Sequence, residues 1–243
     1  MGELEEILDQ IDTLKFLYIH YQNLHPSFDE DFKLRYTYES NAIEGNTLTL
    51  IETKVVLEGV AIGEKSLREH FEVVNHHKAI ALVEEFAKDC NPLSEYEIKS
   101  IHALILQNIN DLNAGAYRKC EVRILGAKHI PPNPLDVPSL MQEFIKDYHS
   151  LQAHPVIKAS RAHCVLVGIH PFVDGNGRTS RLVMNLELLK SGYPLINIKS
   201  QDKLEYYQAL DLAHTQGDYS SFDLFVAKNV LDRLKEIKRF CRL

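Results

Sequence analysis

The side chains best suited to chemistry lie in one segment, from His170 to Arg181. It reads His-Pro-Phe-Val-Asp-Gly-Asn-Gly-Arg-Thr-Ser-Arg. It therefore combines an imidazole that can accept a proton near neutral pH with a carboxylate, Asp174, of the kind that binds Mg²⁺. An apolar run precedes the segment and a helical pattern follows it, which predicts a loop that opens a helix. Because His170 precedes a proline, we expect an extended backbone at this residue.

The turn into the predicted helix is suited to an anion. Gly175 and Gly177 flank Asn176, so successive N–H groups can converge on one anion without a Cβ in the way. At a helix start these groups lack intrahelical partners, and the helix dipole favours negative charge. Arg178 and Arg181 share one side of the helix and can bind different phosphates of one polyphosphate. Taken singly, a glycine-rich turn before a helix is often only a tight turn, and a lone histidine is often structural.

The rest of the chain predicts an all-α fold. Apolar residues recur at helical spacing, and capping-box patterns begin helices at Ser27, Thr49, Ser66 and Ser94. The expected helices span residues 4–18, 27–43, 49–59, 66–88, 94–108, 136–150, 156–169, 175–191, 201–214 and 219–239. We interpret residues 1–60 as an N-terminal helical lobe that packs on a core formed by residues 61–243.

Residues 117–134 break the helical pattern. An apolar stretch ends at Leu125, Gly126 follows it, and a second short apolar stretch leads into prolines at 131, 132 and 134. This pattern predicts a short β-hairpin followed by an extended segment. An irregular loop would carry the same residues and is the alternative.

The composition is that of a globular protein without a charge-based attraction to nucleic acid. The sequence has 34 acidic and 27 basic residues and a net charge of −7 at pH 7. No apolar stretch approaches the ~20 residues of a membrane span, and the acidic start is unlike a secretion signal. The four cysteines form no Cys-x-x-Cys pair. We therefore expect a cytoplasmic protein with no nucleic-acid or membrane partner.

The segment from His170 to Arg181 resembles the signature of the Fic family, His-x-Phe-x-[Asp/Glu]-Gly-Asn-Gly-Arg-x-x-Arg, at every position. Residues 115–118, 131–134 and 206–218 also resemble this family, so the resemblance covers about residues 30–220. It implies a compact helical bundle with one β-hairpin flap. It also implies transfer of AMP from ATP to a Ser, Thr or Tyr hydroxyl of a target protein, with Mg²⁺ and with release of pyrophosphate.

The resemblance also implies roles for individual residues. His170 would be the general base for the target hydroxyl, Asp174 would hold Mg²⁺ between two phosphates, and Phe172 would anchor the loop. The residues that would contact the nucleotide, including an aromatic side chain against adenine, are Gly175, Asn176, Gly177, Arg178, Arg181 and Tyr207. At His214 some relatives carry an asparagine that bonds the base. A core position is the alternative for Tyr207.

The predicted hairpin would be the flap that docks the main chain of the target as an added strand. A connector that only stabilises the fold is the alternative. The residues of this predicted flap are Val122, Arg123, Ile124, Leu125, Gly126, Ala127, Lys128, His129 and Ile130.

A second motif resembles the inhibitory motif of the same family, [Ser/Thr]-x-x-x-Glu-[Gly/Asn]. It comprises Ser40, Glu44 and Gly45, at the end of the second predicted helix. The resemblance implies that Glu44 pairs with Arg181, which then cannot take the γ-phosphate. A solvent-exposed glutamate at a helix end is the alternative.

Three functions remain open at this stage. The first is a protein adenylyltransferase that modifies a target and itself and is restrained by Glu44. The second is a de-adenylylase in which Glu44 orients a water that removes AMP from a modified protein. The third is a non-catalytic ATP-binding regulatory module, against which the intact His170 argues. Relatives often dimerise, and we expect a homodimer here.

Overall fold

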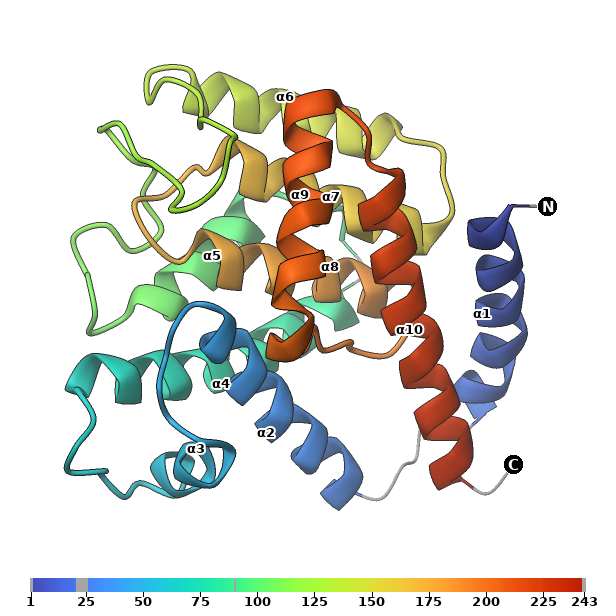
Figure 1. Ribbon diagram of the computed structural model, residues 1–243, viewed down its shortest axis with the longest axis horizontal. Coiled ribbons are helices and arrows are strands. Elements are labelled where there is room, and N and C mark those ends of the chain that lie inside the picture. Colours follow the sequence, from blue (N-terminus) through green and yellow to red (C-terminus); the bar gives the residue numbers. More distant parts are fainter. Residues whose placement is uncertain (1, 21–25, 90, 242–243) are drawn as a thin grey trace.

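The computed structural model describes residues 2–20, 26–89 and 91–241, and in these residues it contains ten α-helices, one 3₁₀ helix and no strand (Figure 1). The prediction of an all-helical chain is confirmed. The elements are α1 (Glu3–His20), α2 (Pro26–Ile43), α3 (Leu50–Leu57), α4 (Leu67–Lys88), α5 (Glu95–Leu106), α6 (Val137–Ser150), α7 (Pro155–Ile169), α8 (Asn176–Lys190), η1 (Ser200–Asp202), α9 (Lys203–Gln216) and α10 (Ser220–Phe240).

Three of the predicted capping boxes begin helices as expected. Thr49, Ser66 and Ser94 each accept a hydrogen bond from the backbone N–H of a glutamate three residues later, whose side chain accepts one in return. By contrast, α2 begins at Pro26, which suits a first helical position because its missing N–H would have no partner there. Ser27 therefore lies inside α2 and is not its N-cap.

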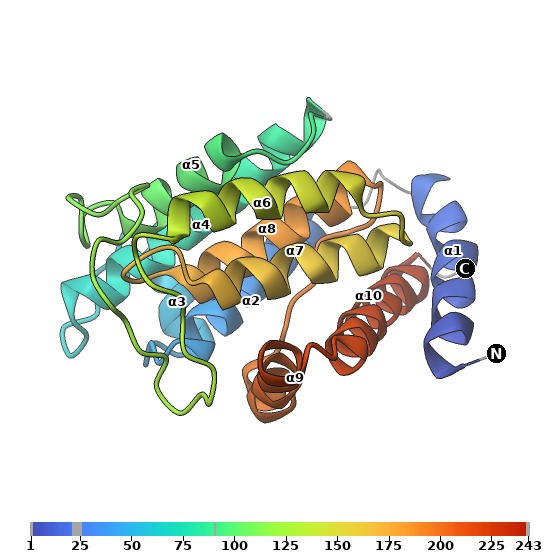
Figure 2. The same ribbon diagram turned by 90° about the horizontal axis from the view of Figure 1, so that it is seen from above.

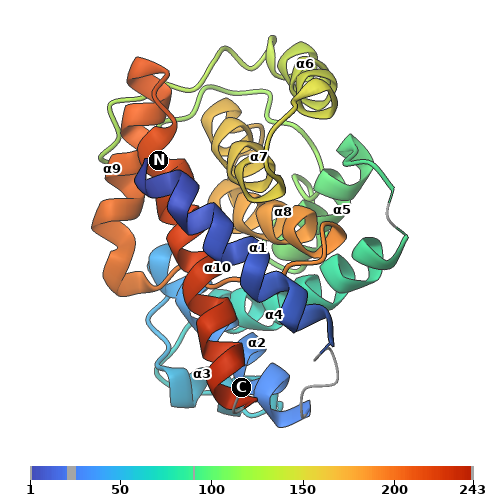
Figure 3. The same ribbon diagram turned by 90° about the vertical axis from the view of Figure 1, so that its right-hand side faces the viewer.

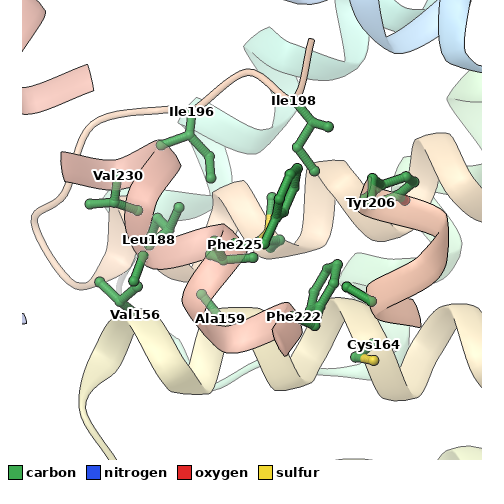
Figure 4. Packing of buried hydrophobic residues seen from close by; sticks show 14 of the residues in the cluster. Val156, Ala159, Cys164, Leu188, Ile196, Ile198, Tyr206, Phe222, Phe225 and Val230 are labelled. Carbon is green, nitrogen blue, oxygen red and sulfur yellow. The ribbon is translucent and has the colours of Figure 1, made fainter. Parts of the chain in front are cut away.

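Helices α7 and α8 lie side by side in the middle of the molecule and carry the signature segment between them (Figures 1 and 2). One apolar core packs them against α1, α9 and α10, and Figure 4 shows part of it, including Phe222 and Phe225 of α10. A second core packs them against α4, α5 and α6. Each fully buried large apolar side chain contributes about 1.5–3 kcal/mol. The start of α8 is therefore fixed from both sides.

The first two helices pack on different parts of this body. Helix α1 crosses α10 (Figure 3), whereas α2 packs on α4 and reaches α8. The division of the chain near residue 60 stays a prediction. Within the described ranges, no helix is long and apolar enough to cross a membrane.

The predicted hairpin is not confirmed. Residues 117–134 form no strand and leave the helical body as a loop between α5 and α6 (Figure 2). Its tip is a turn closed by a hydrogen bond from the N–H of Ala127 to the carbonyl of Ile124, 3.3 Å. The loop is held to other elements instead: the N–H of Lys128 donates to Asp211 of α9, and the His129 ring lies 2.8 Å from the Gly168 carbonyl of α7. A two-stranded hairpin without further strands is at best marginally stable.

Candidate active site

His170 directly follows α7 and has an unusual backbone. Its φ of 51° and ψ of 55° place it in the left-handed region, so the extended conformation predicted from the following proline is wrong. Two contacts hold this conformation. The N–H of His170 closes the last turn of α7 on Leu166, 3.1 Å. Its carbonyl accepts a hydrogen bond from Nε of Arg118, 2.9 Å. A non-glycine residue in this region costs energy and is found preferentially at functional sites.

The protonation state of the His170 ring follows from its contacts. Nδ1 lies 3.2 Å from the carbonyl oxygen of Val167. Because a carbonyl only accepts, Nδ1 carries the proton and Nε2 has a free lone pair. Burial disfavours the charged ring and lowers the pKa of His170 to about 4. At neutral pH the imidazole is therefore uncharged and can take a proton on Nε2.

Asp174 is an anionic carboxylate at the start of α8. Its Oδ1 accepts the N–H of Gly175 at 2.6 Å, and its Oδ2 forms an ion pair with Nη2 of Arg68. Burial alone would raise its pKa, but the charges of Arg178 and Arg68 and the Gly175 N–H hold that pKa below its usual value. Among the described residues, no group of three or more histidine, cysteine, aspartate or glutamate side chains could bind a metal ion. One carboxylate beside a phosphate site suits Mg²⁺, which keeps waters and takes substrate phosphates as ligands.

The turn before α8 is fixed by Asn176. Its side-chain Oδ1 accepts the N–H of Phe172 at 3.0 Å, and its Nδ2 donates to the Phe172 carbonyl at 2.8 Å. The amide therefore holds the loop together, a role that the sequence did not indicate. Phe172 is fully buried and stacks on His102, with 3.6 Å between ring centroids. The N–H groups of Asn176, Gly177 and Arg178 have no intrahelical partner, as at any helix start.

The backbone at Gly175 requires glycine. Its φ of 74° lies in the left-handed region. A Cβ at this position would also lie only 3.2 Å from Cγ2 of Ile105. This close packing places the start of α8 directly against α5.

Arg181 is the more enclosed of the two signature arginines, with 1% of its surface exposed. Its Nη2 lies 2.8 Å from both Oε1 of Glu44 and the carbonyl of Ser40, and its Nε donates to Oγ of Ser40 at 3.0 Å. Nη1 lies 3.4 Å from the hydroxyl of Tyr206. Burial disfavours the charge, but Glu44 and Tyr206 together more than compensate and raise the pKa of Arg181. Ser40 and Glu44 of the predicted inhibitory motif therefore contact the arginine that the resemblance indicated.

Glu44 also occupies the space above the turn. A Cβ added at Gly177 would lie only 2.2 Å from Oε1 of Glu44. The carboxylate thus lies directly on the backbone of the helix start, where an anion would bind. Gly45 follows with φ of 95°, a left-handed conformation that lets the chain leave α2.

Arg178 is 2% exposed and pairs with two carboxylates. Its Nη1 lies 3.3 Å from Oε1 of Glu72, and its Nη2 lies 3.5 Å from Oδ1 of Asp174. Glu72 belongs to α4 and is also buried. Both signature arginines are therefore neutralised by carboxylates of the chain.

A cavity of about 360 Å³ extends from Glu44 and Gly177 past His170 to the loop of residues 117–134. Tyr207 lines it and is 42% exposed. Of the predicted flap, the residues that line the cavity are Ile124, Leu125, Gly126, Ala127 and His129. Val122, Arg123, Lys128 and Ile130 belong to the same loop but do not line it. Asp174, Arg178 and Arg181 are not among the lining residues, and Arg181 lies against Glu44.

His214 of α9 also lines the cavity. Its Nε2 lies 2.8 Å from the carbonyl of Cys164, and burial lowers its pKa. The ring lies directly on α7, since a Cβ at Gly168 would be 2.8 Å from its Nε2. The ring of His129 lies beside it, with centroids 4.7 Å apart.

Sequence reasoning missed three arginine and glutamate side chains that hold this site: Arg68, Glu72 and Arg118. Arg118 is buried and connects the signature to the loop of residues 117–134, because its Nη1 donates to the carbonyl of Cys120 and its Nη2 to that of Pro132. Its place in the Gly-Ala-Tyr-Arg sequence was the one available signal. Arg68 and Asp174 are 106 residues apart, and no local pattern relates them.

Comparisons with known proteins agree with this geometry. A model of the Fic/DOC family matches residues 92–188. A solved structure of a Fic-1 variant from C. elegans is 30% identical in sequence, with a TM-score of 0.84, and the match covers 96% of this chain and 71% of that one. The chain belongs to the Fic/DOC family. The resemblance found in the signature is thereby confirmed.

Other members extend the comparison. A Fic-domain signalling protein from Bacteroides thetaiotaomicron is 28% identical, with a TM-score of 0.84 over 98% of this chain and 97% of that one. The protein adenylyltransferase Fic of Drosophila melanogaster is 40% identical over 197 residues, which are 79% of this chain and 39% of that protein. This Fic/DOC chain thus spans about two fifths of the length of the Drosophila relatives.

Proposed function

We propose that this Fic/DOC chain is a protein adenylyltransferase, which moves AMP from ATP to a Ser, Thr or Tyr hydroxyl of a target protein and of itself. The observation that carries the proposal is the place of His170, whose Nδ1 contacts the Val167 carbonyl and whose ring lines the same cavity as Gly177 at the start of α8. A site that only bound nucleotide would not need such a base. The Drosophila relatives named protein adenylyltransferase support the same assignment.

In the proposed reaction, the triphosphate lies across the start of α8. The N–H groups of the turn and the two signature arginines bind its phosphates. Mg²⁺ held by Asp174 would neutralise further phosphate charge. Nε2 of His170 takes the proton of the target hydroxyl, the hydroxyl oxygen attacks the α-phosphorus, and the bond to the β-phosphate oxygen breaks. Pyrophosphate leaves with its charge stabilised by Arg178 and Arg181, so positioning and electrostatics carry the catalysis.

We assign target docking to the loop of residues 122–130, called the flap from here on. Leu125 and Ile130 are exposed by 99% and 59%, although both are large and apolar. The flap lies on the same cavity as His170 and forms no strand pairs of its own. A target segment that paired with it would gain main-chain hydrogen bonds beside the base. We assign the adenine ring to Tyr207, which lines the same cavity.

Glu44 acts in this proposal as an intramolecular inhibitor. Arg181 cannot bind a γ-phosphate while its Nη2 is paired with Glu44, and the carboxylate repels a phosphate above Gly177. Removing Glu44 would leave Arg181 in place, since Ser40 still holds its Nε and Nη2. The inhibitor can therefore be removed without dismantling the phosphate site.

The test is label transfer from ATP labelled in its α-phosphate. Glu44→Gly should incorporate label into itself and into lysate proteins faster than the wild type. The double variant Glu44→Gly, His170→Ala should lose transfer by about 10²–10⁴-fold, the usual worth of a general base, and still bind nucleotide. Equal incorporation by wild type and Glu44→Gly would remove the inhibitory role. Nucleotide binding by Glu44→Gly without any transfer would favour the non-catalytic module.

A second candidate activity is removal of AMP from a modified protein. It is favoured by the position of Glu44, which lines the same cavity as His170 and could orient a water there. Purified adenylylated target would release AMP with the wild type and not with Glu44→Gly. The two activities thus respond to the same substitution in opposite directions.

A homodimer belongs to the proposal as well. The N-terminal part of the chain exposes large apolar side chains, including Ile51 in α3 by 77% and Val60 after it by 55%. Sedimentation velocity over a range of protein concentrations measures the oligomeric state directly.

A further inference from the structure

We propose that Arg68 forms an ion pair with the carboxylate of Asp174 in the nucleotide-free chain and that Mg²⁺ must displace Arg68 to bind this carboxylate. This rests on the proposed function, because it takes Asp174 as the ligand of Mg²⁺ bound with ATP. Arg68 lies in the first turn of α4, outside the signature, and its Nη2 forms an ion pair with Asp174. A cation and an anion of the site are thus each paired within the chain: Arg181 forms an ion pair with Glu44, and Asp174 forms one with Arg68.

The two oxygens of Asp174 are used differently. Oδ1 accepts the N–H of Gly175 at 2.6 Å and lies 3.5 Å from Nη2 of Arg178, so it is directed to the helix start. Oδ2 contacts Arg68. The side chains of Asp174 and Arg68 are 37% and 56% exposed, so their contact lies on the solvent side of the site. A cation that arrives from solution meets Arg68 on Oδ2 and competes with it.

The helix dipole does not favour an arginine at this position, although the i,i+4 pair with Glu72 does. The dipole of a helix disfavours cations in its first turn and favours anions there. Glu69 next to Arg68 meets that preference and completes the capping box with Ser66. Arg68 therefore lies where the helix dipole disfavours a cation, and its ion pairs with Glu72 and Asp174 compensate for this unfavourable interaction.

Displacement of Arg68 would be a small movement. Its Nε lies 3.1 Å from Oε1 of Glu72, one turn further along α4. The same oxygen lies 3.3 Å from Nη1 of Arg178. The two arginines and the two carboxylates, Glu72 and Asp174, balance in charge. When Asp174 binds Mg²⁺, Arg68 keeps Glu72 as its partner, so the displacement of Arg68 needs only the rotation of an exposed side chain.

The experiment measures metal binding apart from turnover. Glu44→Gly protein is saturated with α,β-methylene-ATP, from which AMP cannot be transferred because the methylene bridge between the α- and β-phosphates is not cleaved. The complex is titrated with Mn²⁺, and binding is followed by electron paramagnetic resonance. Adding Arg68→Gln should tighten Mn²⁺ binding by about two- to fivefold, the effect expected of an exposed ion pair. The matched control is Arg35→Gln. Arg35 has a side-chain exposure of 55% and pairs with Asp31, so this variant makes the same change in net charge and should leave the affinity unchanged.

Two results would overturn the inference. One is an unchanged or weaker Mn²⁺ affinity in Arg68→Gln, which would make Arg68 a support of the site or a phosphate ligand. The other is a gain that persists when Asp174→Asn is added, because Mn²⁺ would then not compete for Asp174. The proposed function fails separately: if Glu44→Gly transfers no AMP while Arg68→Gln still tightens Mn²⁺, the adenylyltransferase assignment falls and the Arg68–Asp174 competition stands.

Discussion

The phosphate end of the cavity, at the start of α8, and its flap end are held by different kinds of contact. At the phosphate end, Phe172 is fully buried, Arg181 is 1% exposed and Asn176 bonds both the N–H and the carbonyl of Phe172. At the flap end, the side chain of Leu125 is almost fully exposed, and a single backbone hydrogen bond closes the turn. Reaction chemistry needs groups fixed in advance, whereas docking of a variable partner needs a segment that can adapt.

The largest effect that separates the two ends is expected from Asn176→Ala. It removes two buried hydrogen bonds and leaves the backbone of Phe172 without those partners, so it should destabilise the chain by about 2–4 kcal/mol. Transfer by the Glu44→Gly protein should fall as well, because the turn that we propose to bind phosphate loses its support. Urea unfolding followed by circular dichroism measures the stability.

Asn229→Ala is the matched control for that substitution. The side chain of Asn229 donates one hydrogen bond to the Phe225 carbonyl within α10. Its loss should cost about 1 kcal/mol or less and leave transfer unaffected. Equal losses of stability in the two variants would show that the phosphate end is not held more firmly than an ordinary helix surface.

This contrast also explains how much could be predicted. Helix starts at Thr49, Ser66 and Ser94 depend on residues three apart, and local spacing captured them. The turn at Gly175 and the adjacent arginines are likewise local, so their place at a helix start followed from spacing alone. The Glu44–Arg181 contact joins residues 137 apart and came only from resemblance to the Fic family.

What the sequence could not provide depends on tertiary partners. The left-handed backbone of His170 contradicts the preference of a residue before proline, and contacts with Arg118 and Leu166 hold it there. The flap carries a pattern compatible with strands, yet it is held by contacts with α7 and α9 and forms no ladder. Local propensity is weakest where distant partners decide the conformation.

A smaller effect is expected from Leu125→Ala at the flap. Because this side chain is 99% exposed, the free energy of unfolding should change by less than about 0.5 kcal/mol. If the flap docks the target, kcat/KM for a protein substrate should fall by about 5- to 10-fold, which corresponds to an interface residue worth somewhat over 1 kcal/mol. The KM for ATP should stay the same. A parallel loss with a protein target and in ATP binding would assign Leu125 to the nucleotide instead.

The smallest expected effect is that of pH on transfer. The burial that lowers the pKa of His170 to about 4 keeps its base form populated throughout the neutral range. Removing Glu44 also removes a nearby negative charge that raises this pKa, so the Glu44→Gly protein should keep the base form to at least as low a pH. Its initial rate should therefore change less than about twofold between pH 6 and pH 8. A histidine of ordinary pKa, about 6.5, would lose most of its base form as pH falls from 8 to 6.

The same lowered pKa predicts how the stability of the folded chain depends on pH. Between about pH 6.5 and pH 4 His170 is protonated in the unfolded state but not in the folded state, so the free energy of unfolding falls as pH falls through that window. Rate and unfolding free energy measured on the same samples separate the two, and a rate midpoint near pH 6.5 in a fully folded protein would mean that His170 is not held in its uncharged form by the fixed phosphate end.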